Sequence, residues 1–315
     1  GWFGNGSYSR DDDKHGLGDW DPSIKKLPKG LSYIAKEALK RKVGFGIWLE
    51  PEMVNPQSEL YQKHPDWIIT QSKREPILGR HQEILDLTRP EVQAFEWDII
   101  DKTLRPNPDI TYVKWDCNRY ITQPGSSYLQ PADQSHLWID YNRALYRLMD
   151  RFAKGFPNVM AMLCAGGSGR VDYGAMPYFH SFWPSDNTDP LGRIKIQWGF
   201  SHFFPANTIS AHVTRMGKRH LKMAIDVALS GAFGIDLALD KATAEERAQI
   251  ADAVKLYKER IRPLVMHGEL YRLVSPYESP LASLSYVSTD KQKAVVYFYQ
   301  TKDGNEPRVM LGGLD

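Results

Sequence analysis

Short apolar runs alternate with longer amphipathic stretches over most of the chain. Runs that end abruptly in polar or glycine residues predict buried β-strands; they lie at 43–49, 84–87, 111–115, 158–164, 179–183, 208–213 and 233–237. Apolar positions at helical spacing predict helices between these runs, at about 25–42, from 90, at about 133–152, from 190 to about 204, at 223–229 and at 243–262. Strand and helix alternate throughout, which favours a parallel α/β barrel over a β-sandwich.

The pattern changes near residue 270. Two alternating runs, 281–287 and 294–299, flank a Thr289-Asp290-Lys291 turn, which is typical of an antiparallel hairpin. We therefore predict two domains, an α/β barrel over residues 1–268 and an antiparallel β-domain over residues 269–315.

One strand carries a carboxylate at its end. The β-branched and aromatic run that begins at Thr111 ends in Lys114-Trp115-Asp116, and residues at the carboxyl ends of barrel strands converge on one mouth. Side chains two apart on a strand share a face, so the Lys114 ammonium should lie beside Asp116. A nearby cation favours the ionised carboxylate that a nucleophile needs. The alternative is a structural ion pair.

A second strand also ends in a carboxylate. The aromatic run from Phe179 to Trp183 precedes Asp186, and Asp189-Pro190 opens the following helix. Thr188 or Asp189 is therefore expected to cap that helix. Asp186 has no such capping role and is expected to project from the end of the strand.

Glu50 and Glu52 compete for the same chemistry. They follow the apolar run 43–49, and Pro51 between them ends the strand. Carboxylates beside a proline more often accept backbone N–H groups of a loop, so we rank both as supporting residues. Trp48 in the same run would by default belong to the core.

Composition narrows the class of function. The formal net charge is +2 with 25% charged residues, which gives no basic field for nucleic acid. No apolar run reaches the length of a membrane span. The chain has two cysteines, Cys117 and Cys164, with no metal-like spacing. We expect both to be free thiols in a reducing compartment, and hence a cytoplasmic protein.

The segment Lys114-Trp115-Asp116-Cys117-Asn118-Arg119 resembles the nucleophile motif of glycoside hydrolase family 36, the retaining α-galactosidases. Other stretches agree with motifs of that family: Trp48-Leu49-Glu50-Pro51-Glu52-Met53, Gly79-Arg80-His81-Gln82, Cys164 with its glycine loop, and Trp183-Pro184-Ser185-Asp186-Asn187-Thr188-Asp189. His81 departs from the usual asparagine, and residues 215–219 differ from the family loop, which leaves subsite contacts there open.

The resemblance implies a (β/α)8 TIM barrel followed by the start of a C-terminal β-sandwich domain. Gly1-Trp2-Phe3 matches the tail of a first-strand motif whose two aspartates would precede residue 1, so the first strand is expected to be missing or partial. By the same resemblance Asp116 is the nucleophile and Asp186 the general acid/base. The implied substrate-binding residues are Trp48, Arg80, Lys114, Cys164, Gly167 and Trp183.

The function implied is the release of terminal α-linked galactose from oligosaccharides such as raffinose and melibiose, by double displacement and without a cofactor or metal. The expected partner is a small α-galactoside, with neither nucleic acid nor membrane, and the full-length form is expected to be a homo-oligomer. Alternatives on the same fold are an α-N-acetylgalactosaminidase and a galactosyl or raffinose-type transglycosylase. A non-catalytic carbohydrate-binding barrel and a metal-dependent hydrolase fit the motifs less well.

Overall fold

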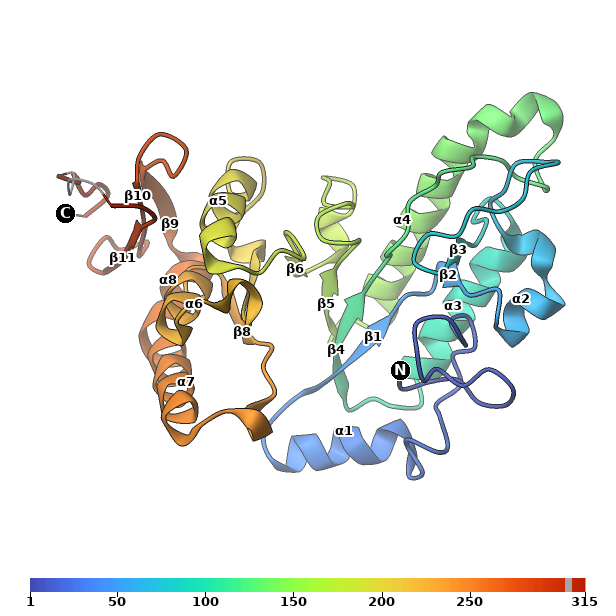
Figure 1. Ribbon diagram of the computed structural model, residues 1–315, viewed down its shortest axis with the longest axis horizontal. Helices are drawn as coiled ribbons and strands as arrows, with labels where there is room; N and C mark the ends of the chain where they lie inside the picture. The colour runs from blue at the N-terminus through green and yellow to red at the C-terminus, as the bar shows by residue number, and fades with distance from the viewer. Residues whose placement is uncertain (304–307, 315) are drawn as a thin grey trace. The chain divides into compact units, whose positions relative to one another are not determined.

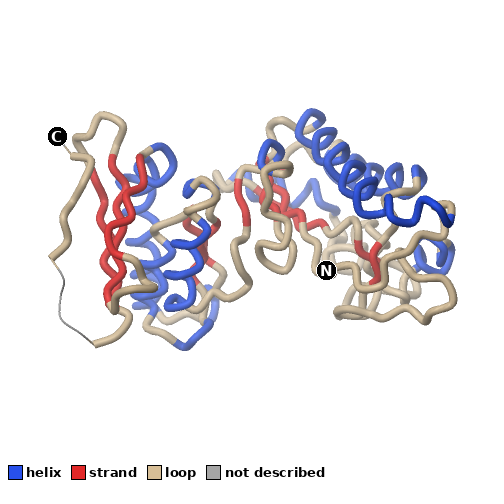
Figure 2. The backbone as a smooth tube through the Cα atoms, turned by 90° about the horizontal axis from the view of Figure 1, so that it is seen from above, coloured by secondary structure: helices blue, strands red, loops and turns tan. Residues whose placement is uncertain are grey.

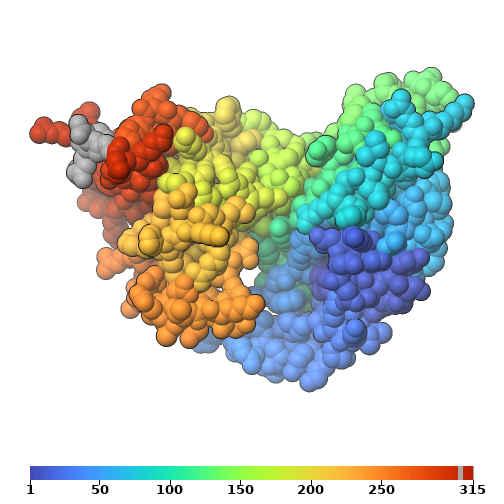
Figure 3. Space-filling view, viewed as in Figure 1, coloured from blue at the N-terminus to red at the C-terminus, as the bar shows by residue number. Residues whose placement is uncertain are grey.

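The computed structural model describes residues 1–303 and 308–314. The chain forms two compact units, unit 1 from Gly1 to His180 and unit 2 from Ser181 to Asp315 (Figure 1). Residues 1–29 form loops and turns, and Figure 3 shows them as the dark blue surface of unit 1.

Unit 1 is built on three parallel strands in the order β1, β4, β5, which Figure 1 labels. Figure 2 draws the strands of the chain in red and its helices in blue. Their bounds are β1 Phe45–Leu49, β4 Ile110–Trp115 and β5 Met160–Leu163. The strands are short, and β4 buries Ile110, Val113 and Trp115 while none of its residues is exposed, as expected for a sheet covered by helices.

Helices surround this sheet. Their bounds in unit 1 are α1 Gly30–Lys40, α2 Glu59–Lys63, α3 Pro90–Leu104 and α4 Leu137–Gly155, with short 3₁₀ turns η1 Pro65–Trp67, η2 Pro131–His136 and η3 Met176–Tyr178. Helix α4 buries one apolar face, and its Phe152 ring meets the edge of Trp115 on β4 at 6.0 Å. The amphipathic pattern predicted this face.

Two predicted elements of unit 1 are shorter than expected. Helix α1 starts at Gly30 and not at residue 25, because residues 23–27 close a turn and Pro28 follows. The strand expected at 84–87 is only β3 Glu83–Ile84, which pairs antiparallel with β2 Met53–Val54. Beyond it, the Leu85 N–H donates to Glu52 O in the register of the β2–β3 pair, and the Asp86 N–H donates to Trp67 O in the turn η1.

Unit 2 continues the alternation of strand and helix. Its elements up to residue 267 are β6 Ser181–Phe182, α5 Pro190–Phe200, η4 Ala206–Thr208, β7 Ser210–Val213, η5 Met216–Lys218, α6 Leu221–Ala228, β8 Ala232–Ile235, η6 Leu239–Lys241, α7 Ala244–Leu256, η7 Tyr257–Ile261 and α8 Arg262–His267. Strands β7 and β8 are parallel. The helix expected at 243–262 contains the π-helical turn η7, because Pro263 has no N–H to continue the α-helical ladder.

The last strands form an antiparallel sheet in the order β11, β10, β9. Their bounds are β9 Glu269–Val274, β10 Leu281–Val287 and β11 Ala294–Gln300, so the predicted hairpin is confirmed and gains a third strand. Buried tyrosines tie this sheet to α6: the Tyr286 hydroxyl donates to Ser230 O at 2.9 Å and the Tyr297 hydroxyl to Leu229 O at 2.8 Å.

The fold class is therefore α/β, with parallel strands followed by a C-terminal antiparallel sheet, as predicted. Closure of the strands into one barrel would involve both units and stays a prediction, as does the domain boundary at residue 268.

Candidate active site

The tips of the three parallel strands lie in register. Leu49 on β1 faces Trp115 on β4, which faces Leu163 on β5. The ladder continues one residue further, since the Asp116 N–H donates to Leu49 O at 2.7 Å and the Cys164 N–H to Trp115 O at 2.8 Å. Because the strands are in register, the residues that follow each strand lie side by side at the carboxyl end of the sheet.

Asp116 is held in place at this edge from several sides. Its carboxylate accepts the Trp48 indole N–H at 2.9 Å and the Cys117 N–H at 2.9 Å. The Lys114 Nζ lies 3.5 Å from Oδ2, which confirms that Lys114 and Asp116 share a face. Asn118 and Cys164 also hydrogen-bond the carboxylate. Asp116 is buried, with only 4% of its surface exposed.

These contacts decide the charge of Asp116. Burial by itself raises the pKa of this carboxyl, but the Lys114 charge and the hydrogen bonds from Trp48, Asn118 and Cys164 outweigh it, so the pKa lies below its usual value. Asp116 is therefore ionised at neutral pH, which is the state required of a nucleophile.

The pKa of Glu50 is shifted in the opposite direction to that of Asp116. It is 1% exposed, and its Oε1 accepts the Asn118 N–H while Gln82 Nε2 lies 3.4 Å from Oε2. Burial, followed by the charge of Asp116, raises the pKa of Glu50 to about 7. The residue holds the backbone that follows Asp116, in line with its predicted supporting role.

An aromatic cluster fixes the Trp48 ring. Phe3 stacks on it with ring centroids 6.1 Å apart, and Trp20 lies at 5.8 Å. The Trp2 indole N–H donates to the Trp48 carbonyl at 2.8 Å. Loop residues 1–20 therefore orient the indole that bonds Asp116.

The glycine loop, residues 165–170, follows β5 and lies at the same carboxyl end of the sheet in unit 1. Gly166 and Gly167 have positive φ angles of 56° and 98°, which glycine adopts without steric cost. The Gly167 N–H hydrogen-bonds Cys164, whose pKa burial and the charge of Asp116 raise to about 12. Cys164 is therefore a neutral thiol beside the carboxylate. Both cysteines are free and buried, as predicted.

Glu52 anchors this loop. It is fully buried and accepts Arg170 Nη1 and Nη2 at 2.5 and 2.6 Å, the Tyr141 hydroxyl at 2.6 Å and the Trp115 indole at 3.2 Å. The end of the loop, helix α4 and strand β4 thus meet at one carboxylate.

Arg80 sits on a strained turn. Arg80 and His81 both have positive φ, 53° and 59°, between Gly79 and Gln82, whose backbones bond each other in both directions. Such a turn favours Asn and Gly, so the departure to His81 carries a conformational cost. Asn55 Nδ2 donates to His81 O at 2.7 Å and helps to hold the turn. Arg80 is half exposed and lies 3.8 Å from Asp13.

Asp186 and Trp183 belong to unit 2. The Trp183 indole N–H donates to Asp186 Oδ1 at 3.0 Å, and the ring packs against His212 with centroids 4.6 Å apart. Asp186 is exposed, whereas Trp183 is buried. Asp189 precedes α5 without a side-chain capping bond and pairs with Arg219 at 3.2 Å.

The structure brings together four predicted site residues of unit 1: Trp48, Lys114, Asp116 and Cys164. Gly167 joins them through Cys164. For a retaining enzyme Asp116 and Asp186 should lie about 5–5.5 Å apart, and this separation stays a prediction. Asn118 was not among the predicted site residues, although it lies two residues after Asp116 within the motif that runs from Lys114 to Arg119.

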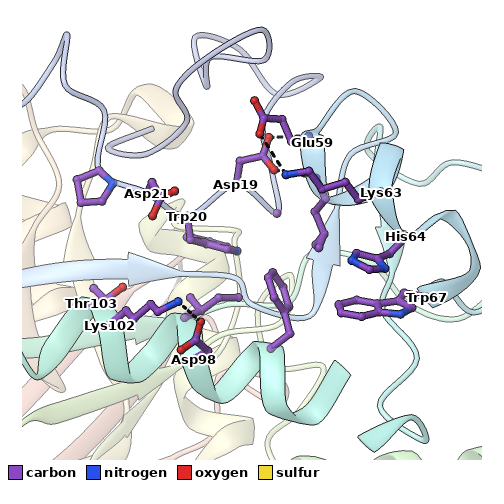
Figure 4. A pocket seen from close by; sticks show the side chains of 15 residues that line it. Asp19, Trp20, Asp21, Glu59, Lys63, His64, Trp67, Asp98, Lys102 and Thr103 are labelled. Atoms are coloured by element: carbon purple, nitrogen blue, oxygen red, sulfur yellow. Dashed lines mark hydrogen bonds and ion pairs between the residues drawn. The ribbon is translucent and has the colours of Figure 1, made fainter. Parts of the chain in front are cut away.

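A cavity of about 380 Å³ in unit 1 adjoins residues 117–121 after β4 and the glycine loop after β5. A second, of about 370 Å³, lies between residues 18–22, α2 and α3, with Trp20 on one side and the stacked rings of His64 and Trp67 on another (Figure 4). The second contains none of the predicted site residues.

Metal and membrane features can be stated for the described part of the chain. Within residues 1–303 and 308–314, no three or more His, Cys, Asp or Glu side chains are arranged to hold a metal ion. Over the same residues, no helix has the length and apolar character needed to span a bilayer.

These features define an α/β domain with a buried, ionised carboxylate at the tip of a strand, the position where parallel α/β folds do chemistry. Comparison with known proteins agrees: the Melibiase family model matches residues 1–268. The chain therefore belongs to the melibiase family, and its resemblance to the α-galactosidases of glycoside hydrolase family 36 is confirmed.

Individual relatives support this assignment. Alpha-galactosidase AgaA of Geobacillus stearothermophilus is 42% identical over 324 residues, covering 100% of this chain and 44% of AgaA. Alpha-galactosidase 1 of Pediococcus pentosaceus is 37% identical, covering 98% of this chain and 42% of that protein. The crystal structure of the α-galactosidase AgaB of Geobacillus stearothermophilus matches with a TM-score of 0.94 at 42% identity, covering 100% and 44% of the two chains. The chain thus spans less than half the length of these relatives.

Proposed function

We propose that this chain is the catalytic part of an α-galactosidase that removes terminal α-linked galactose with retention of configuration. The observation that carries the proposal is the ionised Asp116 at the tip of β4, held by Lys114, Trp48 and Cys164. A buried carboxylate with this set of donors can attack an anomeric carbon.

In the first step an Asp116 oxygen attacks the anomeric carbon while the bond to the leaving oxygen breaks, and protonated Asp186 donates its proton to that oxygen. In the second step Asp186, now a carboxylate, takes a proton from water, and the water oxygen displaces Asp116. Two inversions give net retention. Trp48, Arg80, Lys114, Cys164, Gly167 and Trp183 are proposed to bind the galactosyl unit.

Structures of relatives support the choice of substrate. One variant of AgaA from Geobacillus stearothermophilus has been solved with raffinose and another with stachyose. Both sugars end in an α-linked galactose, so we propose small α-galactosides of this type as the substrates of this chain.

Two further proposals concern the setting of the enzyme. The two cysteines are free and buried, which suits a reducing compartment, so we place the protein in the cytoplasm. We also propose that the full-length protein is a homo-oligomer.

The test is Asp116→Ala in the full-length protein, assayed with an activated aryl α-galactoside. Turnover should fall by at least about a thousandfold, because no other group replaces the nucleophile. Azide should restore part of the activity by occupying the space left by the carboxylate, with a galactosyl azide as product. Asp98→Ala, on the exposed face of α3, is the control and should retain activity. Unchanged turnover in the Asp116 variant would end the assignment.

A further inference from the structure

The cavity between residues 18–22, α2 and α3 is separate from the site around Asp116, because none of the predicted site residues lines it. Figure 4 shows three walls: the loop that carries Trp20, helix α2 with the residues that follow it, and one side of α3. The volume of about 370 Å³ lies within the range of small-molecule sites.

The loop wall of this cavity is held firmly in place. The Asp19 carboxylate accepts the N–H groups of Glu59 and Leu60 at 2.9 and 3.0 Å, which fastens the loop to the first turn of α2. The next residue, Trp20, packs against Phe3 with ring centroids 4.2 Å apart. The cavity is therefore formed before any ligand enters, which lowers the entropic cost of binding.

Trp20 brings a hydrogen-bond donor that the protein does not use. Trp20 is 7% exposed, and among the described residues its indole N–H has no hydrogen-bond partner. The neighbouring indoles differ, since Trp2 donates to the Trp48 carbonyl and Trp48 to Asp116. An unpaired buried donor costs about 1–3 kcal/mol. In Figure 4 the nitrogen end of the Trp20 ring faces the other lining residues, so an acceptor in the cavity would satisfy it.

Another wall consists of aromatic rings. His64 stacks on Trp67 with centroids 4.0 Å apart, and Phe95 on α3 meets Trp67 edge-on at 5.8 Å. All three side chains are only partly buried and line the cavity. Such rings offer apolar surface against which the C–H face of a sugar ring can pack.

The charges around the cavity favour a neutral ligand. The lining contains four acidic and two basic side chains, an excess that disfavours an anion. Glu59 already pairs with Lys63 at 3.7 Å, whereas Asp21 is exposed on the lining and can accept hydroxyl groups. An organic cation would suit the carboxylates and the rings but would leave the Trp20 N–H without an acceptor.

We propose that this cavity is a second binding site, which takes a neutral pyranose sugar independently of the site at Asp116. The Trp67 ring packs against the apolar face of the sugar, the Trp20 N–H donates to one of its oxygens, and Asp21 accepts a hydroxyl. The inference goes beyond the proposed function and does not require Asp116 to be a nucleophile.

The test measures the binding of galactose and of glucose to the full-length protein by saturation-transfer NMR. The galactose analogue 1-deoxygalactonojirimycin is added to fill the galactosyl position at Asp116, and at least one of the two sugars should still bind. Trp20→Phe keeps a ring but removes the N–H, and should weaken this binding by about twofold to tenfold. Trp67→Ala removes the stacking ring and should weaken it by about tenfold.

Trp97→Phe is the matched control, because Trp97 also lies on α3 but packs against Arg151 at 3.8 Å and lies outside the cavity lining. It should leave sugar binding unchanged. Binding that is equally strong in the Trp20 and Trp67 variants would overturn the proposal. Absence of any sugar signal once the analogue is bound would also overturn it, whether the sugars bind only at Asp116 or another part of the full-length protein covers the cavity. Turnover of an aryl α-galactoside tests the proposed function separately.

Discussion

Two neighbouring carboxyl groups at the strand tips differ in charge because their partners differ. Asp116 and Glu50 are both buried, and burial raises the pKa of each. Asp116 receives the Lys114 charge and several N–H and S–H donors, which bring its pKa below the usual value. Glu50 has fewer such partners and faces the charge of Asp116, so its pKa rises to about 7. The residue proposed as the nucleophile is therefore the one surrounded by donors.

This difference predicts how stability depends on pH. The pKa of Glu50 is 4.5 when unfolded and about 7 when folded, so folding favours its protonated form. Its contribution is fully present below pH 4.5 and is lost as the pH rises through about 7. At about 1.4 kcal/mol per pH unit the change amounts to about 3 kcal/mol. Glu50→Gln, which stays neutral and keeps an acceptor for Asn118, should remove this part of the slope.

The measurement is the free energy of unfolding by urea from pH 4.5 to 8.5. The variant should gain stability relative to the unmodified protein as the pH rises. Glu91→Gln, at an exposed position in the first turn of α3, is the control and should give a curve parallel to that of the unmodified protein. A parallel curve for Glu50→Gln would contradict the predicted ionisation.

At the scale of elements, the sequence was sufficient wherever the signal is local. The alternation of strand side chains placed Lys114 beside Asp116, and the helical spacing of α4 predicted its buried face. Contacts between distant segments could not be predicted from local patterns. Trp48 hydrogen-bonds Asp116, which is 68 residues away in the sequence, and Arg170 hydrogen-bonds Glu52, which is 118 residues away. Both depend on strand register, which periodicity does not set. The positive φ of Arg80 and His81 was also hidden, because neither residue is typical of such a turn.

Glu52, with its partners Arg170, Tyr141 and Trp115, joins separate elements of unit 1. Glu96 on α3 lies close to Glu52 and is fully buried, with no hydrogen-bond partner on either carboxyl oxygen among the described residues. Burial, then the charge of Glu52, raises the pKa of Glu96 well above its usual value, so this carboxyl is neutral. Arg170 therefore balances a single charge, that of Glu52, and ties the end of the glycine loop to β4 and α4.

Arg170→Lys should test this junction. Lysine keeps the positive charge but cannot donate to both Glu52 oxygens from a planar fork, which leaves a buried acceptor short of a partner. We expect the free energy of unfolding to fall by about 1–3 kcal/mol. Arg105→Lys is the matched control, because Arg105 also holds a carboxylate, that of Asp101, at two oxygens but on the surface. It should change stability little; equal losses in both variants would show that burial of the Glu52 pair is not the cause.

At the scale of the whole molecule, the proposed chemistry needs one group from each unit. Asp116 follows β4 in unit 1, and Asp186 follows β6 in unit 2. Their separation decides the stereochemistry of the reaction: about 5–5.5 Å lets Asp116 attack directly and gives retention, whereas about 6.5–9.5 Å leaves room for a water and gives inversion. The product therefore reports the distance between two residues of different units in the working enzyme.

We expect the first-formed sugar to be α-galactose. Proton NMR of the anomeric signal, recorded within minutes of adding the full-length enzyme to an aryl α-galactoside, distinguishes it from β-galactose before mutarotation mixes the two. Asp186→Ala should slow raffinose more than an activated aryl galactoside, because only the poor leaving group needs the proton. A β-product with Asp116 still essential would mean that the two carboxyl groups work across a water, and the double displacement would have to be abandoned.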